Sequence, residues 1–181
     1  MQPSLTTDRL RLRPYEMSDA PEIRRLAGDR RVAQPTAAIP HPYPEGAAEA
    51  WISAHPDLFA SKKGVSYAVT LAATAQLVGT VSLLDVAAQH SRAEVGYWVG
   101  VEHWGRGYCT EALALLLSFG EGHFRVSRFV GRCLATNLGS ARVLAKSGFI
   151  PEGRQVKHVH HFGSYEDMLL FGKCAARRGD A

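Results

Sequence analysis

The most informative stretch of this chain is Val99-Gly-Val-Glu-His-Trp-Gly-Arg-Gly-Tyr-Cys-Thr-Glu-Ala112. A strand-like apolar run from Val95 to Val101 breaks at a turn rich in glycine, and a long apolar helix follows at once. Backbone amides at a helix N-terminus have no intrahelical acceptor, so together they form an anion site. Gly105 and Gly107 let such a backbone curl around a bulky anion without Cβ obstruction. The stretch therefore predicts a cradle for a phosphate-bearing cofactor.

The composition favours one globular domain, which we expect to span residues 1–181. Hydrophobic residues make up 46% of the chain and charged residues 21%, which is enough apolar side chain for a real core. The longest apolar stretch, Ala112 to Phe119, is too short to cross a bilayer, and the first residues lack a signal-peptide pattern. Cys109, Cys133 and Cys174 are odd in number and widely spaced, which favours neither disulfides nor a zinc site. We expect a cytoplasmic protein without a membrane partner.

The charge is mildly positive. The formal net charge is +4, and the basic residues are dispersed apart from the pair Arg177-Arg178 near the end of the chain. Nucleic-acid binding would call for a concentrated basic stripe or a known module, so we expect no nucleic-acid partner. A modest positive balance suits a small polyanionic ligand.

The first part of the chain alternates between strand and helix signals. Leu10 to Pro14 alternates with period two, which predicts a strand with one buried face. A cap, an early proline and an acidic first turn at Ser18-Asp-Ala-Pro-Glu22 predict a helix to about Ala27. Four prolines then indicate an irregular loop, unusually long and semi-rigid, of the kind that forms a lid: Pro35, Pro40, Pro42 and Pro44.

The remaining elements follow from periodicity and turn residues. A helix is expected from about Pro44-Glu45 over Ala47 to His55, and the main buried helix over Thr110 to His123. Asn137 is expected to cap a further helix that ends at Gly148. Strands are expected at Val65 to Ala72, Gln76 to Val86, Arg92 to Val101, Arg128 to Ala135, Phe149 to His160 and Ser164 to Phe171. The order predicts a mixed α/β (α+β-like) domain.

Two separate motifs resemble the GNAT N-acetyltransferase superfamily. They are Trp104-Gly-Arg-Gly-Tyr-Cys-Thr-Glu-Ala112 and Asn137-Leu-Gly-Ser-Ala-Arg-Val-Leu-Ala-Lys-Ser-Gly-Phe149. The closer likeness is to the branch of ribosomal-protein N-terminal alanine and serine acetyltransferases, which the opening Leu5-Thr-Thr-Asp-Arg-Leu-Arg-Leu-Arg-Pro14 also resembles. In the family loop Gln/Arg-x-x-Gly-x-Gly/Ala, Trp104 takes the first position, Gly107 the fourth and Cys109 the last. Cysteine in place of glycine or alanine departs from this pattern, and the loop is expected to tolerate it because cysteine packs as a small apolar residue.

The resemblance implies a twisted mixed sheet of six to seven strands, with helices on both faces and a splayed pair of parallel strands. Acetyl-CoA would lie between those strands, Val95–Val101 and Arg128–Ala135, and no metal is implied. Its pyrophosphate would lie on amides of the loop, and its pantetheine arm would pair with the backbone at Val99 and Val101. The implied cofactor-binding residues are Val99, Val101, Trp104, Gly105, Arg106, Gly107, Tyr108, Cys109, Thr110, Asn137 and Ser140.

Acetyl transfer from a thioester needs a neutral amine, a polarised carbonyl and a proton for the departing thiolate. Backbone donors at a strand bulge near Trp98–Val99 are expected to polarise the carbonyl. The resemblance implies Ser140 as the acid and Asn137 as a residue that orients pantetheine or a water. A purely structural role would also account for both residues, with Asn137 as the N-cap of the helix and Ser140 as a serine of its first turn. Glu94 is a candidate general base, whereas Tyr97 and Tyr108 are expected to pack.

Cys109 and two histidines are weaker candidates for a chemical or acceptor-binding role. Cys109 stands at a helix N-terminus, which favours a thiolate nucleophile, but the loop uses this position for a small filling residue. His158 and His160 share one face of a strand, and we expect them to contact the acceptor or solvent; the familiar spacing of a metal site is missing.

The sequence leaves two classes of function open. The first is an acetyl-CoA-dependent N-acetyltransferase acting on a protein N-terminus or on a small amine such as an amino acid, polyamine or antibiotic. The second is a non-catalytic CoA-binding sensor. An edge strand near the C-terminus suggests pairing across a homodimer. Dinucleotide and Walker-type binding are disfavoured, because Thr110 stands where a third glycine would be needed and no Gly-Lys-Ser/Thr follows.

Overall fold

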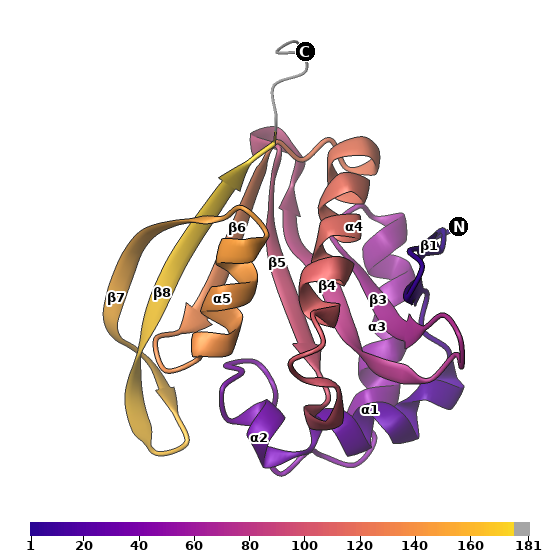
Figure 1. Ribbon diagram of the computed structural model, residues 1–181, viewed down its shortest axis with the longest axis horizontal. Helices are drawn as coiled ribbons and strands as arrows, with labels where there is room; N and C mark the ends of the chain where they lie inside the picture. The colour runs from indigo at the N-terminus through magenta and orange to yellow at the C-terminus, as the bar shows by residue number, and fades with distance from the viewer. Residues whose placement is uncertain (176–181) are drawn as a thin grey trace.

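The computed structural model describes residues 1–175 and shows a mixed α/β fold built on one eight-stranded sheet (Figure 1). The pair Arg177-Arg178 lies outside the described residues. The strand order is β1-β2-β3-β4-β5-β6-β8-β7, and every neighbouring pair is antiparallel except β5 and β6. The strands are β1 Leu5–Thr6, β2 Leu10–Arg13, β3 Val65–Leu71, β4 Leu77–Ala87, β5 Arg92–Val99, β6 Arg128–Leu134, β7 Ile150–His161 and β8 Ser164–Cys174.

Four of the five described helices agree with the sequence signals, including the cap at Asn137, and the short second helix was not expected. The five are α1 Ala20–Ala27, α2 Arg30–Ala33, α3 Ala47–Ala60, α4 Tyr108–His123 and α5 Leu138–Lys146. Short 3-10 turns lie at Met17–Asp19, Ala88–His90 and Val101–His103. The expectation of six to seven strands was one strand short, because the two-residue β1 pairs with β2 through Leu5 and Thr6. None of the described helices is long and apolar enough to span a membrane.

Helices cover both faces of the sheet, as expected. In Figure 1, α4 and α5 lie in front of the central strands, whereas α1 and α3 lie behind them. On the front face, α4 buries Leu113 and Leu116 against residues such as Val95 and Phe129 of the sheet. On the back face, Ile23 of α1 and Ile52 of α3 belong to a second buried cluster. The first core includes residues of both β5 and β6, and Trp98 of β5 packs against the second.

The parallel pair β5 and β6 separates along its length, which confirms the expected splay. The two strands pair from Arg92 with Arg128 to Val95 with Gly131, and this pairing ends there. Both strands continue beyond that point, β5 to Val99 and β6 to Leu134, and they diverge toward the bottom of Figure 1. The split leaves backbone edges that a ligand can pair with in the manner of an added strand.

Two local expectations about β5 were wrong. The strand was expected to reach Val101, but it ends at Val99, because Val101 begins a 3-10 turn in which its carbonyl accepts the amide of Trp104. The bulge expected near Trp98–Val99 is also missing from that place. The register with β4 is regular there, and it shifts instead between Leu84 and Ala87.

Helix α5 lies against β6 at a glycine, so its position depends on a close approach. A Cβ added at Gly131 would lie 2.5 Å from Cδ2 of the buried Leu144. We expect Gly131→Ala to lower the free energy of unfolding by about 1–3 kcal/mol through overpacking. Gly153→Ala is the matched control, because its nearest atom would be 3.8 Å away. Denaturant unfolding of both variants checks this, and equal stabilities would contradict the close approach.

Candidate active site

The loop before α4 has the shape that the sequence predicts for an anion cradle. Gly105 and Gly107 have positive φ values of 74° and 80°, a conformation that costs other residues energy. A Cβ added at Gly105 would meet nothing within 4 Å. The first intrahelical hydrogen bond runs from the Glu111 amide to the Gly107 carbonyl, 3.1 Å apart. Within residues 1–175, the amides of Tyr108, Cys109 and Thr110 therefore have no intrahelical acceptor and point out of the helix.

The N-terminal hairpin between β1 and β2 holds this loop from outside. The Arg9 guanidinium donates to the Arg106 carbonyl at 3.2 Å and forms an ion pair with Glu111. Thr7 donates its hydroxyl to the same carboxylate at 2.5 Å. Burial opposes ionisation of Glu111, but the hydrogen bonds from Thr7 and Arg9 keep its pKa below the usual range. Glu111 thus anchors the first turn of α4 as well as complementing the helix dipole.

The edge of β5 that faces the split is partly capped by Trp104. The amide of Gly100 donates to the Val78 carbonyl at 2.9 Å. Along β5, residues whose backbone groups point toward β4 alternate with residues whose backbone groups point away from it, as in any antiparallel pair. Because Gly100 points toward β4, the backbone groups of Val99 face the split. The Trp104 indole donates to the Val99 carbonyl at 2.7 Å, and the Trp104 side chain is half exposed. By the same alternation, and because pairing with β6 ends at Val95, the amides of Tyr97 and Val99 remain as donors on this edge.

Ser140 and Tyr97 meet at the split, although 43 residues separate them in the chain. Their hydroxyl oxygens are 2.9 Å apart, and the Tyr97 hydroxyl also lies 3.1 Å from the Ser140 carbonyl. Burial raises the pKa of Tyr97 well above its ordinary value, so the phenol keeps its proton. Tyr97 was expected to pack only; nothing in the sequence spacing pairs it with Ser140, and the fold alone brings the two together.

Asn137 has two partners that belong to different parts of the site. Its side-chain oxygen accepts the Ser140 amide at 2.9 Å, which confirms the expected N-cap of α5. Its side-chain nitrogen donates to the Pro35 carbonyl at 2.9 Å, in the proline-rich loop. Asn137 therefore joins the helix that carries Ser140 to the loop after α2.

Glu94 lies apart from Ser140. The two Glu94 oxygens accept from Arg132 at 3.0 and 2.7 Å, and this ion pair raises the pKa of Arg132. Alternation along β5 puts Glu94 on the face opposite Tyr97. The pair links β5 to β6 beside the split, so the carboxylate is engaged rather than free to act as a base.

Cys109 has a neutral thiol. Burial raises its pKa to about 12, which outweighs any lowering by the helix N-terminus. We expect Cys109→Ala to keep turnover within about twofold, since the backbone amide of the cradle is unchanged. Steady-state rates and CoA affinity of the variant check this. A variant that binds CoA but no longer turns over would instead assign the thiol a chemical role.

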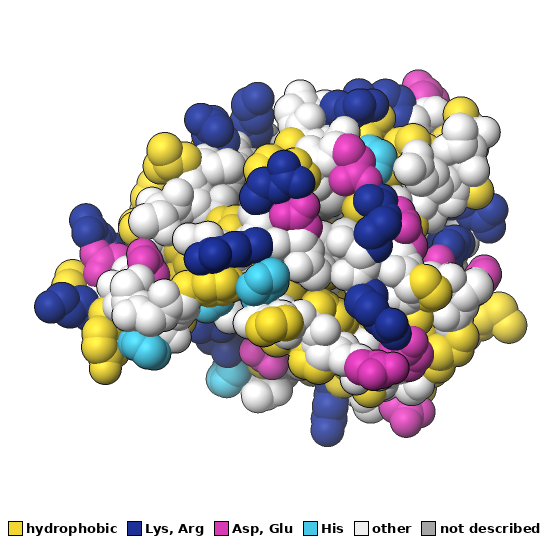
Figure 2. Space-filling view, turned by 90° about the horizontal axis from the view of Figure 1, so that it is seen from below, with side chains coloured by type: hydrophobic (Ala, Val, Ile, Leu, Met, Phe, Trp, Pro, Cys, Tyr) yellow, Lys and Arg dark blue, Asp and Glu magenta, His cyan; other side chains and the backbone are white. Residues whose placement is uncertain are grey.

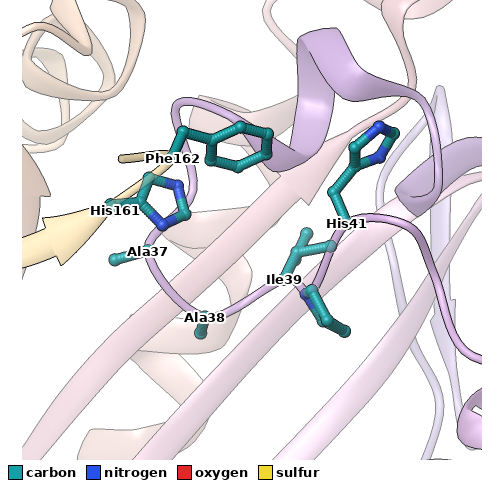
Figure 3. A pocket seen from close by; sticks show the side chains of 7 residues that line it. Ala37, Ala38, Ile39, His41, His161 and Phe162 are labelled. Carbon is teal, nitrogen blue, oxygen red and sulfur yellow. The ribbon is translucent and has the colours of Figure 1, made fainter. Parts of the chain in front are cut away.

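A cavity of about 400 Å³ opens beside the split, between the proline-rich loop and the tip of the β7–β8 hairpin (Figure 3). His161 and Phe162 face it from the hairpin, and Ile39 and His41 from the loop. The His161 ring lies 2.9 Å from the Gln34 carbonyl, which ties the hairpin to the loop. Its remaining lining residues are Ala37, Ala38 and Pro40.

Neither of the histidines expected to meet an acceptor lines this cavity; His161 does. His160 packs against Tyr165, with ring centroids 5.1 Å apart. The hairpin turn brings His161 and Phe162 over the loop. Contact of His158 or His160 with an acceptor stays a prediction. In the described part of the chain, no group of three His, Cys, Asp or Glu side chains is arranged to hold a metal ion.

A second groove of about 330 Å³ runs from the start of α4 between α4 and α5. Thr110, in the first turn of α4, lines it, and the charged side chains of its lining are Lys146, Lys173 and Glu121. Lys173 also donates to the Ser147 carbonyl at 3.0 Å, just after α5. Seen from below, basic and acidic side chains are interspersed across the face of the molecule, beside hydrophobic and histidine side chains (Figure 2).

Comparison with known proteins agrees with this geometry. The model of the acetyltransferase (GNAT) domain matches residues 9–150. An uncharacterised N-acetyltransferase of Bacillus subtilis (strain 168) is 29% identical, covering 94% of this chain and 96% of its own.

Two solved structures share the fold over nearly their whole length. The ribosomal-protein-S5-alanine acetyltransferase of Vibrio fischeri has a TM-score of 0.83 at 24% identity, covering 96% of this chain and 97% of its own. The spermidine N-acetyltransferase of Vibrio cholerae, solved with CoA and spermine, has a TM-score of 0.80 at 20% identity, covering 93% and 96%.

Proposed function

The chain belongs to the GNAT acetyltransferase family and is an acyltransferase, and from this premise we propose that it moves the acetyl group of acetyl-CoA to a protein N-terminal α-amine. The observation that carries the proposal is the set of outward-pointing amides at the α4 N-terminus, directly beside the split between β5 and β6 and the Tyr97–Ser140 pair. An anion site, a strand-like channel and a proton donor are the parts that a thioester donor requires.

The residues of the cradle fit the donor's chemistry. The amides of Tyr108, Cys109 and Thr110 would hold the pyrophosphate of acetyl-CoA, with the helix dipole favouring its charge. Arg106, in the same loop, would add a charge-assisted contact. Lys146 and Lys173 at the α4–α5 groove would serve the nucleotide end of the donor.

The pantetheine arm would run along β5. The Val99 amide would pair with one of its carbonyls, since the Val99 carbonyl is held by Trp104. The sequence also suggested that pantetheine pairs with the backbone of Val101. Because β5 ends at Val99, we propose that this pairing is made by backbone groups that precede Val101.

The reaction we propose is direct attack in a ternary complex. The amine lone pair forms a bond to the acetyl carbon, the carbon–sulfur bond breaks, and the thiolate takes the hydroxyl proton of Ser140. The proton that the acylated nitrogen loses then passes through a water to the Ser140 oxygen, which restores the hydroxyl. Tyr97, whose phenol stays protonated, donates a hydrogen bond to the Ser140 oxygen as that proton leaves. The Ser140 hydroxyl is a weak acid, so a hydrogen bond from Tyr97 to its oxygen lowers the free-energy cost of giving its proton to the thiolate.

The general base stays a prediction. Glu94 is the residue that the sequence suggested, but both of its oxygens accept from Arg132. A water that takes the amine proton and passes it to the Ser140 oxygen would fit the open cavity beside the split.

The cavity between the proline-rich loop and the hairpin tip is the proposed acceptor site. Its lining, within the described residues, contains no carboxylate. A polyamine carries further cationic amines that call for acidic partners, so this lining favours an N-terminal amine over a polyamine. Small amines without a second cation, and a CoA sensor without turnover, are the alternatives.

Release of free CoA thiol in the presence of an amine panel tests the proposal. The panel should hold short peptides with free N-termini, the same peptides blocked by N-acetylation, an amino acid and spermidine. We expect thiol release with free peptides and none with blocked ones. CoA binding without turnover on any amine would favour the sensor, and turnover on spermidine alone would contradict the acceptor proposal.

A further inference from the structure

Phe162, at the tip of the β7–β8 hairpin, gathers three nitrogen-bearing side chains around its ring. Cζ of Arg30 lies 5.7 Å from the ring centroid, His41 stacks at 5.8 Å, and the His161 ring is 4.7 Å away. Phe162 is 39% exposed, and three of these four residues line the cavity beside the split. The hairpin tip and the segment from α2 through the proline-rich loop thus meet in one aromatic and nitrogen-rich cluster. Figure 3 shows its members His41, His161 and Phe162.

Arg30 is the charge of this cluster. Its neighbour Arg31 forms an ion pair with Asp29 at 2.7 Å, and Arg24 pairs with Glu49 at 3.0 Å. Arg30, by contrast, has no carboxylate within ion-pair distance in residues 1–175. A guanidinium near an aromatic face keeps its in-plane donors for a planar anion, and carboxylates match that fork.

The histidines are oriented by backbone carbonyls. His41 Nδ1 lies 3.2 Å from the Gly28 carbonyl, and His161 Nε2 lies 2.9 Å from the Gln34 carbonyl. Because a carbonyl only accepts, each of these ring nitrogens carries a proton. Both rings are thereby fixed at the cavity. Among the described residues neither ring forms an ion pair; the Asp29 carboxylate lies within electrostatic range of His41, and its partner is Arg31.

We propose that this cluster, with Arg30 as its cation, binds a carboxylate of the acceptor next to the amine that is acetylated. The inference rests on the proposed function, because it concerns the acceptor of that same site. It adds the chemical class of the acceptor: an N-terminus followed by an acidic side chain. A free amino acid offers the same carboxylate from a different source.

Peptides that differ at a single position test this. Three short peptides share a serine N-terminus and carry aspartate, asparagine or lysine as the second residue; free serine is the fourth acceptor. For the wild-type protein we expect kcat/KM for the aspartate peptide to exceed that for the asparagine peptide by about five- to tenfold, with the lysine peptide lowest. Added salt should shrink the difference. A preference for free serine over all peptides would assign the carboxylate to an amino acid.

The Arg30→Ala variant should bring the aspartate-to-asparagine ratio close to one. Arg31→Ala is the matched control: it removes a neighbouring arginine that already has Asp29 as its partner, so the ratio should persist. Loss of the ratio in both variants, or its survival in Arg30→Ala, would overturn the proposal.

Binding separates this inference from the proposed function. The affinity of the CoA-loaded protein for the aspartate and asparagine peptides can be measured by calorimetry whether or not turnover occurs. Equal affinities in the wild type would overturn the inference while acetyl transfer stands. Selective binding without thiol release would support the inference for this cavity and contradict the enzymatic function.

Discussion

Replacing Ser140 by alanine is expected to lower kcat by about a hundredfold, within the range that general-acid catalysis usually contributes. The reason is that the departing CoA thiolate would lose the hydroxyl that we propose as its proton donor. CoA affinity should stay unchanged, because the Asn137 side chain caps the backbone amide of residue 140 and not its hydroxyl. Single-turnover rates and CoA titration of the variant measure the two quantities separately.

Tyr97 makes this prediction sharper. Tyr97→Phe removes the phenol 2.9 Å from the Ser140 oxygen and should lower kcat by about tenfold, also with little effect on CoA affinity. The double variant should be no slower than Ser140→Ala alone, since the phenol acts through the serine. Tyr67→Phe is the control, because it removes another buried tyrosine hydroxyl, on β3. A fully active Ser140→Ala would remove the serine from the mechanism, and additive losses would separate the two residues.

Gly107→Val is expected to damage the donor site more than any other loop substitution. Residue 107 has a φ of 80°, where a β-branched residue costs about 1–3 kcal/mol. If the loop keeps its shape, the free energy of unfolding falls by that amount. If the loop relaxes, the amides of the cradle turn away and CoA affinity falls by about five- to 150-fold. Calorimetry with CoA and denaturant unfolding together capture both outcomes.

Gly122→Ala is the matched control for this substitution. Gly122 lies within α4, the helix that Gly107 precedes, and a Cβ added there meets nothing within 4 Å. In a helix, alanine is the better residue, so stability should hold or rise slightly while CoA affinity is unchanged. A Gly107→Val variant with both wild-type stability and wild-type CoA affinity would show that the positive φ at this position does not matter for the site.

The donor half of the site could be predicted from sequence because its signals are local. A strand, two glycines and a helix start lie within a dozen residues, and Asn137 and Ser140 lie in one helical turn. Local chemistry fixes such geometry: a positive φ favours glycine, and a helix start leaves amides free. The same locality allowed the extents of most strands and helices to be expected correctly.

The parts that sequence missed depend on contacts across the fold. Tyr97 meets Ser140 only because α5 packs over the split, and Arg9 meets Glu111 only because the first hairpin reaches the start of α4. Glu94 looked like a free base until the neighbouring strand brought Arg132 against it. The proposed acceptor site depends on a hairpin turn, and His161 at that turn lines the cavity, whereas His158 and His160 do not. The periodicity of a sequence describes one helix or strand at a time and does not predict which side chains of different elements meet.

A structure with CoA bound tests the central claim most directly. We expect the pyrophosphate oxygens on the amides of Tyr108, Cys109 and Thr110, and the CoA sulfur within hydrogen-bond reach of the Ser140 hydroxyl, about 3–3.5 Å. A pyrophosphate that lies away from the α4 N-terminus, or a sulfur on the far side of β5 and β6 from Ser140, would contradict the account.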